Sequence, residues 1–482
     1  MTDLTTRNRW LALYVLCLAD LMIVLDSTIV NVALPSIRTD LGFSEASLAW
    51  VVNAYLLTFG GFLLLAGRFG DLYGQRRLFL IGIAEFTVAS LLCGVANSQT
   101  FLIVARAVQG LGGAIVSAIA LSLIMILFTE PAERAKAMGV IGFVLSGGGT
   151  AGVLLGGTLT DLLSWHWIFL VNIPVGIAAF LLCRVLLPSD AEARKGSLDI
   201  GGAVTITASL MLAVYAIVNG NQAGWTSGQT LGMLGGAAAL LAAFVVIETR
   251  VSEPLMPLGI WKVRNVASAN ITGILVAGAM FAWFFLSALY LQRVLGYSAL
   301  EVGLAFLPGT LLWGASSLLL SDKLVMRFGI KPPLLAGLGC YLVALLLFAR
   351  APVDGNFFAD VLPAMLVLGI GGGITFNPIL LAAMSGVEPN EAGLASGVVN
   401  TSFMMGGALG LAILASVAAS RTDSLRASGH GPLDALNGGY HLAFMIGGVF
   451  AVLAGAVAAA FIHAEAPAGA HGGEPVPAVE AE

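Results

Sequence analysis

The sequence predicts an all-α polytopic membrane protein with fourteen transmembrane helices. Of the 482 residues, 58% are hydrophobic and only 10% are charged, whereas a soluble domain carries about 25% charged residues. Fourteen unbroken apolar stretches come close to the roughly 20 residues that a spanning helix requires. They leave too little chain for soluble enzyme domains, and they lack the period-two alternation that marks an outer-membrane barrel.

The fourteen predicted helices form two six-helix halves separated by a two-helix insert. The first half spans 1–187, residues 188–265 hold the insert and its flanking loops, and the second half spans 266–463. A short basic loop recurs after the second and the tenth helix, as in duplicated transporters. Residues 464–482, rich in Pro, Gly and Glu, are expected to form a disordered cytoplasmic tail. The predicted helices are 10–33, 48–66, 78–96, 101–127, 137–161, 165–187, 199–218, 230–248, 266–291, 300–321, 333–349, 358–384, 392–418 and 441–463.

The basic residues favour a cytoplasmic position for both termini. When the loops are assigned to alternate sides of the membrane, sixteen of the 22 Lys and Arg residues fall on the side of the N-terminus. Five fall on the opposite side, and Arg106 lies within a helix. Cytoplasmic loops are enriched in basic residues. We therefore expect a multi-pass protein of the cell's inner or plasma membrane.

A short, glycine-rich and charged loop is expected to act as a cytoplasmic latch. It connects the second and third predicted helices and reads GRFGDLYGQRR. Its glycines allow a tight turn, and a carboxylate among arginines can form an ion pair or cap a helix. The alternative is a solvated basic loop that merely obeys the topology rule. The candidate latch residues are Gly67, Asp71, Gly74, Arg76 and Arg77.

Two charges of opposite sign inside the predicted helices are the leading candidates for chemistry. A charge at the centre of a spanning helix costs about 2.5 kcal/mol or more, so each one that is retained is a functional hypothesis. Asp26 lies in the first helix, and Arg106 lies near the outer end of the fourth at a similar depth. The two are placed to pair. Such a pair either responds to protonation or serves as a static structural ion pair.

Two further carboxyl groups fall within predicted helices. Asp20 shares a polar stripe of the first helix with Ser27 and Asn31, since residues at this spacing lie on one helical face. This stripe is a candidate wall of a substrate cavity. Glu85 lies near the cytoplasmic end of the third helix. It is either a neutral or snorkelling carboxyl group or a secondary site for protons or cations.

Glycines of the fifth predicted helix form a candidate packing ridge. Gly148, Gly152 and Gly156 recur every four residues, which lets another helix approach closely. The same run fits the GxGxxG nucleotide pattern, but no strand precedes it, and a nucleotide site is rejected. The four cysteines lie on different predicted helices without metal-ligand spacing. Neither a metal nor another cofactor is expected.

The ninth predicted helix contains an unusual density of aromatic residues. Aromatic stripes more often contact the core or lipid, but this helix begins a three-helix unit and is expected to help line a cavity. The candidate residues are Asn270, Phe281, Trp283 and Phe284, together with Thr375 and Asn377 of the twelfth helix.

Several motifs in this order resemble those of the major facilitator superfamily, and specifically its fourteen-helix drug:proton antiporters. The motifs are LDSTIVNVALP at 25–35, the loop 67–77, RAVQG at 106–110, the glycine run 147–157 and WHWIFLVNIPVG at 165–176. The motifs cover the first half in order, and the helix count extends the likeness over nearly the whole chain. The resemblance implies the major facilitator fold and proton-driven export by alternating access.

Under this resemblance Asp26 and Arg106 match the proton-coupling positions, and Asp71 matches the latch between the halves. We therefore expect an exporter of hydrophobic drugs or secondary metabolites, not an enzyme, that confers multidrug or antibiotic resistance as a monomer in the lipid bilayer. No GxxxxGK[ST] motif is present, so the proton gradient is the expected energy source, and no basic cluster suggests nucleic acid. The alternatives are a proton-coupled symporter or importer of the same fold and, less favoured, a membrane-embedded enzyme or receptor.

Overall fold

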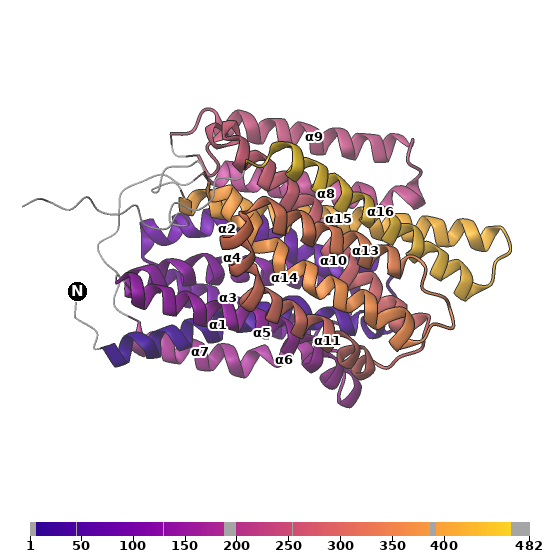
Figure 1. Ribbon diagram of the computed structural model, residues 1–482, viewed down its shortest axis with the longest axis horizontal. Helices are drawn as coiled ribbons and strands as arrows, with labels where there is room; N and C mark the ends of the chain where they lie inside the picture. The colour runs from indigo at the N-terminus through magenta and orange to yellow at the C-terminus, as the bar shows by residue number, and fades with distance from the viewer. Residues whose placement is uncertain are drawn as a thin grey trace, which may run out of the picture.

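The computed structural model describes residues 6–44, 46–128, 130–187, 199–252, 254–385 and 392–463. In these ranges every regular element is a helix, and the long helices run roughly along the longest axis of the molecule (Figure 1). Thirteen of the described helical spans are long and apolar enough to cross a membrane. The predicted all-α membrane class is therefore confirmed, and the predicted tail 464–482 lies outside the described residues.

The remaining predicted segment, 137–161, lies within α5 (Pro131–Leu162), a helix of 32 residues that is not among the thirteen spans. The count of fourteen therefore stays a prediction. The bundle has two faces, which we call the N-terminal face, where α1 (Thr6–Leu41) begins, and the opposite face, where α1 ends.

In the first half, helices distant in sequence interlock. Helix α4 packs against α2 and α3, α1 packs against α5, and α7 lies against both α1 and α3. The bounds are α2 (Trp50–Tyr73), α3 (Gln75–Gly94), α4 (Gln99–Leu127), α6 (Trp167–Leu170) and α7 (Asn172–Leu186), with a 3₁₀ turn, η1 (Ser47–Ala49), before α2.

In the second half, α10 packs against α15 and α16, α14 packs against α11 and α13, and α13 also contacts α16. A π-helical turn joins α11 to α12, and another precedes α14. The bounds are η2 (Leu258–Lys262), α10 (Arg264–Arg293), α11 (Ala299–Ser316), η3 (Ser317–Ser321), α12 (Asp322–Phe328), α13 (Lys331–Phe348), η4 (Phe357–Val361), α14 (Leu362–Met384), α15 (Ala392–Ala427) and α16 (Pro432–Phe461).

Two helices between the halves, α8 (Ile200–Ala223) and α9 (Gly228–Glu248), form a hairpin at the edge of the bundle (Figure 1). The two helices pack against each other, and α8 also contacts α2 and α15. Each begins with a side-chain cap. The carboxylate of Asp199 accepts a hydrogen bond from the amide of Gly202, and the hydroxyl of Ser227 accepts one from the amide of Thr230. The insert therefore borders one helix from each half.

Several helices extend beyond the predicted segments. The segment predicted at 441–463 begins earlier, at Pro432, because proline is well suited to the first turn of a helix. The end of α15 and the start of α16 project past the neighbouring helices (Figure 1). The segment predicted at 165–187 is divided into α6 and α7.

The predicted glycine ridge of α5 lies against α1. A Cβ atom on Gly148 would meet the side chain of Val24 at 3.1 Å, and one on Gly156 would meet the carbonyl oxygen of Ile29 at 2.6 Å. At Gly152 the space is filled by α1 in the same way, with the carbonyl of Leu25 at 3.0 Å. Glycine is therefore required for this close approach.

The two halves are fastened to each other at the opposite face. The carboxylate of Asp161, near the end of α5, accepts hydrogen bonds from the amides of Ala299 (3.2 Å) and Leu300 (2.9 Å) at the start of α11. The side-chain amide of Gln292 in α10 donates to the carbonyl oxygen of Val32 in α1 at 2.8 Å. The Asp161 contacts satisfy the first two amides of α11 across the junction, because these amides lack partners within their own helix.

The contact between α10 and α15 generates a stability prediction. A Cβ atom on Gly410 would collide with the backbone of Gly278, so Gly410→Ala should destabilise the protein by about 1–3 kcal/mol through overpacking. The measurement is the melting temperature of the detergent-solubilised protein.

The matched control is Gly455→Ala in α16, where a Cβ atom meets nothing within 4 Å. Alanine there should leave stability unchanged or raise it by up to about 1 kcal/mol, because alanine is the better helix former. Equal melting temperatures for the two variants would contradict the close packing of α10 and α15.

Candidate functional site

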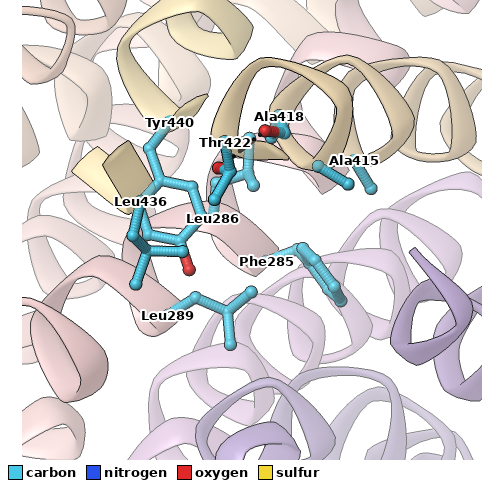
Figure 2. A pocket seen from close by; sticks show the side chains of 9 residues that line it. Phe285, Leu286, Leu289, Ala415, Ala418, Thr422, Leu436 and Tyr440 are labelled. Carbon is cyan, nitrogen blue, oxygen red and sulfur yellow. Dashed lines mark hydrogen bonds between the residues drawn. The ribbon is translucent and has the colours of Figure 1, made fainter. Parts of the chain in front are cut away.

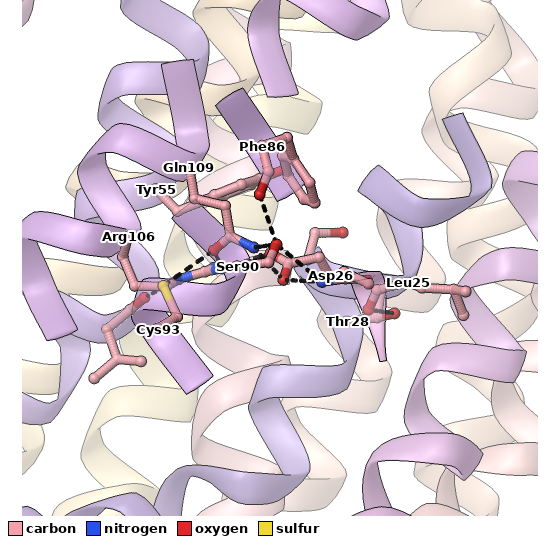
Figure 3. Close-up of polar contacts among 12 residues, drawn as sticks. Leu25, Asp26, Thr28, Tyr55, Phe86, Ser90, Cys93, Arg106 and Gln109 are labelled. Carbon is pink, nitrogen blue, oxygen red and sulfur yellow. Dashed lines mark hydrogen bonds and ion pairs between the residues drawn. The ribbon is translucent and has the colours of Figure 1, made fainter. Parts of the chain in front are cut away.

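An ion pair closed off from solvent lies at the centre of the first half. The guanidinium Nη1 of Arg106 in α4 contacts Oδ2 of Asp26 in α1 at 2.5 Å. Both side chains have an exposed fraction of about zero. The structure thus brings together the two charges that the sequence analysis placed at similar depths (Figure 3).

The second oxygen of the Asp26 carboxylate accepts from two side-chain amides. Nε2 of Gln109 donates to Oδ1 at 2.7 Å, and Nδ2 of Asn172, the first residue of α7, donates to the same atom at 3.1 Å. With Arg106 on the other oxygen, the carboxylate receives three donors. A buried carboxylate is tolerated in its ionised form when it is paired and hydrogen-bonded in this way.

Arg106 has partners besides Asp26. Its Nε donates to the carbonyl oxygen of Val51 at 3.0 Å, and Nη1 also donates to Oε1 of Gln109 at 2.6 Å. The guanidinium lies over the ring of Tyr55, 4.4 Å from its centroid, which adds a cation–π interaction. Since α2 supplies two of these contacts, the guanidinium stays stabilised when the carboxylate changes.

Ser90 of α3 links the two amides that bind Asp26. Its Oγ accepts from Gln109 at 2.8 Å and from Asn172 at 3.4 Å, and it donates to the carbonyl oxygen of Phe86 at 2.8 Å. Figure 3 shows Ser90, Gln109 and Arg106 converging on the carboxylate of Asp26. The sequence analysis did not assign roles to Ser90 and Tyr55, although a serine within an apolar helix is a detectable signal.

Asp20 lies outside this network. Its carboxylate accepts from the hydroxyl of Ser117 in α4 at 3.4 Å, and its exposed fraction is 8%, compared with zero for Asp26. The other two residues of the predicted stripe bond to their own helix, Ser27 to the carbonyl of Val24 and Asn31 to the carbonyl of Ser27. Asp20 is therefore the more accessible of the two carboxylates of α1.

Glu85 of α3 faces α4. A Cβ atom on Gly112 would collide with its carboxyl group, so the absence of a side chain at this position makes room for it. Both carboxyl oxygens lack a hydrogen-bond partner among the described residues. Glu85 does not join the hydrogen bonds of Asp26, and its predicted secondary role stays a prediction.

The aromatic residues of α10 separate into two groups. The ring of Phe284 stacks on Phe306 of α11, and the ring of Trp283 meets Phe306 edge-on. Phe281 instead contacts Phe403 of α15 at 6.2 Å between ring centroids. Trp283 has an exposed fraction of 2%. Its ring is therefore part of the core of the second half.

The polar residues of the predicted cavity also point to different neighbours. Asn270 donates to the carbonyl of Val266 on its own helix, and Thr375 packs against Gly337 of α13. Asn377 donates to Asp322 of α12. A cavity shared by all of these residues stays a prediction.

A small cavity between α10, α15 and α16 is lined by other residues, as Figure 2 shows. Most of its lining is apolar, and Thr422 and Tyr440 are the hydroxyl-bearing residues in it. None of the predicted cavity residues lines it.

The predicted latch loop is mostly helical. Helix α2 continues to Tyr73, and Gly74 with a φ of 102° makes the turn into α3. Beyond the turn, Arg76 donates to the carbonyl of Arg184 in α7, and Gln75 donates to the hydroxyl of Ser122 in α4 at 2.6 Å. These contacts stay within the first half. The side chain of Asp71 lies outside the described residues, so a latch between the halves stays a prediction.

Comparisons with known proteins agree with this architecture. Residues 16–411 match the family model described as Major Facilitator Superfamily. A puromycin resistance protein of Streptomyces alboniger is 39% identical over 450 residues, which cover 91% of this chain and 89% of the relative. A cephamycin export protein of Amycolatopsis lactamdurans is 39% identical over 416 residues, 85% of each chain. A solved nucleoside transporter shares the fold, with a TM-score of 0.67 at 13% identity over 93% of this chain and 99% of that one.

The network around Asp26 generates a prediction for Gln109→Leu. Leucine has a similar size but removes one donor from the carboxylate and one acceptor from the guanidinium. We expect a loss of about 1–3 kcal/mol in the free energy of unfolding, because buried polar groups are left unsatisfied. Thermal unfolding in detergent measures the loss.

The control is Gln229→Leu on the exposed surface of α9, which should change stability by no more than about 0.5 kcal/mol. If Gln109→Leu changes the free energy of unfolding as little as the control does, the Gln109 amide does not stabilise the ion pair.

Proposed function

This chain belongs to the major facilitator superfamily and is a membrane transporter, and we propose that it exports hydrophobic antibiotics or related small molecules in exchange for protons. Relatives named for puromycin resistance and for cephamycin export, each 39% identical over most of the chain, support the substrate class. The single observation that supports proton coupling is the solvent-excluded Asp26–Arg106 ion pair.

Asp26 can accept a proton without leaving its partner unsatisfied. Protonation of Oδ2 neutralises the carboxylate and removes its attraction for Nη1 of Arg106. The guanidinium keeps the carbonyl of Val51, the Oε1 atom of Gln109 and the ring of Tyr55. Without such secondary partners, a buried and unpaired charge would cost several kcal/mol. The site therefore supports both protonation states.

A change in protonation would also loosen contacts between helices. Asp26 holds α1 to α4 through Arg106 and to α7 through Asn172. Neutralising the carboxylate weakens both contacts, since a hydrogen bond to a charged group is about twice as strong as one to a neutral group. Proton binding thereby shifts the balance between two arrangements of the first half, as alternating access requires.

Asp20 is the candidate group for substrate recognition in this cycle. It lies on the same helix as Asp26 but is buried less completely, with an exposed fraction of 8%, and its contact with Ser117 at 3.4 Å is long. A carboxylate in a low-dielectric site favours cationic ligands. Proton coupling by Asp26 and substrate binding near Asp20 would then share one helix, α1.

In this proposal the N-terminal face is cytoplasmic, the protein acts as a monomer in the inner or plasma membrane, and no cofactor is needed. Residues 1–187 and 266–463 form the two moving halves, and 188–265 form the insert. The contacts of Asp161 and Gln292 then close the extracellular side.

The central experiment compares Asp26→Asn with Asp20→Asn in proteoliposomes. An asparagine amide cannot exchange a proton in place of the Asp26 carboxylate, so accumulation driven by a pH gradient should be abolished while substrate binding remains measurable. Asp20→Asn should retain coupling and lower affinity, most strongly for cationic substrates. Binding and proton-coupled flux are measured for both variants with a cationic and a neutral substrate.

Coupled flux in Asp26→Asn and its loss in Asp20→Asn would reverse the two roles. If both variants couple, Glu85 becomes the leading proton site and the proposal for Asp26 is wrong. Flux of protons and substrate in the same direction would instead indicate the symporter of this fold.

The topology is tested by reporter fusions after Asp199, Gly224 and Arg264. The distribution of basic residues predicts cytoplasmic, extracellular and cytoplasmic signals in turn. An extracellular signal at Arg264 would remove the two-helix insert and the assignment of fourteen helices.

A further inference from the structure

Two carboxyl groups that the proposed transport cycle does not use lie in the insert, at the N-terminal face of the bundle. Asp199 immediately precedes α8, and Glu248 is the last residue of α9. Each has an exposed fraction of only 4%. Carboxylates are rarely buried to this degree without a compensating partner.

One oxygen of each carboxyl group has a backbone donor. Oδ1 of Asp199 accepts from the amide of Gly202 at 2.7 Å, and Oε2 of Glu248 accepts from the amide of Met256 at 3.0 Å. The other two oxygens, Oδ2 of Asp199 and Oε1 of Glu248, have no donor among the described residues.

These two unsatisfied oxygens face each other. The Asp199 and Glu248 side chains lie within hydrogen-bonding range, and both oxygens converge beside Gly202, where a Cβ atom would collide with them. A hydrogen bond between two carboxyl groups requires that one of them carries a proton, because an ionised carboxylate is an acceptor only.

Among the described residues, no positive charge replaces that proton. Leu65 of α2, Ala203 of α8 and Leu255 form an apolar cluster where these elements meet. The basic residues on the packed elements, Arg68 on α2 and Arg250 after α9, form no ion pair with either carboxylate, as judged over the described part of the chain. Two adjacent carboxylates in an apolar site cannot both ionise without a large electrostatic cost.

We propose that Asp199 and Glu248 hold one proton between them, and that this shared proton fastens the start of α8, the end of α9 and the segment leading to α10. We call this arrangement the carboxyl clasp. The protonated carboxyl group donates an O–H hydrogen bond to the other, so both previously unpaired oxygens have a partner. Loss of the proton leaves two repelling charges, which separates the helix ends and weakens the contact of Glu248 with the amide of Met256.

The carboxyl clasp is thus a second proton-binding site, separate from Asp26. It senses pH at one end of the insert, next to α2 of the first half. The two carboxyl groups face each other, and no other titratable side chain forms an ion pair with them among the described residues, so the proposed proton belongs to the pair and not to one residue.

The test uses the full chain and four proteins: wild type, Glu248→Gln, Glu248→Leu and the control Glu130→Gln, which alters an exposed carboxylate outside the insert. Two readouts are recorded from mildly acidic to mildly alkaline pH. One is the melting temperature, and the other is hydrogen exchange of the Met256 amide, each compared with Glu130→Gln at the same pH.

As pH rises, the wild type should lose melting temperature and protection at Met256, because the clasp is stabilised by a bound proton. Glu248→Gln should lose this pH dependence and stay protected, since its amide donates permanently to Asp199 while its oxygen accepts from Met256. Glu248→Leu should be less stable and unprotected at every pH. Asp26→Asn should keep the wild-type behaviour at Met256, which separates the clasp from the proposed transport site.

Three results would overturn the proposal. In the first, Glu248→Gln shows the same pH dependence as the wild type. In the second, it loses Met256 protection as fully as Glu248→Leu, which would mean that the negative charge is required. In the third, wild-type stability depends on added sodium or magnesium and not on pH, which would identify a metal cation in place of the proton.

Discussion

The buried ion pair between Asp26 and Arg106 is the constraint on which the first half depends. Removing Arg106 would leave the Asp26 carboxylate without an opposite charge in a site closed to solvent. Satisfying both requires side chains or backbone from α1, α2, α3, α4 and α7, so five helices are fixed by one polar centre. The same arrangement leaves Arg106 with neutral partners, which makes a change in the charge of Asp26 tolerable.

Elsewhere in the bundle, the contacts between helices depend on close packing and not on charge. Apolar side chains gain little from leaving lipid for a protein interior, so helix contacts rely on small residues and on shape. Glycines of α5 admit α1, and glycines of α10 and α15 meet at their backbones. Polar contacts between the halves lie near the opposite face, at Asp161 and Gln292. In the proposed transport cycle, these contacts at the opposite face must break when that face opens.

The insert occupies a position from which it can respond to both halves. Helix α8 contacts α2 of the first half, and its Ile217 carbonyl accepts a hydrogen bond from Ser416 of α15 in the second. Within the hairpin, Ser209 donates to the carbonyl of Ala237 at 2.8 Å. This neutral hydrogen bond holds the hairpin at its middle, and the proposed shared proton of the carboxyl clasp would hold it at one end.

The sequence by itself determined the membrane class, the family, and the presence of Asp26 and Arg106 at matching depths, because apolar length and the cost of a charge in lipid are properties of single segments. It also identified the ridge of α5, since glycines four residues apart share a face of any helix. Only the tertiary structure decided that Asn172 and Ser90 complete the ion pair, that Trp283 and Phe281 face different helices, and that Asp199 meets Glu248. The physical reason is that these contacts depend on how distant helices rotate, tilt and slide against each other, and periodicity within one helix does not specify those three quantities.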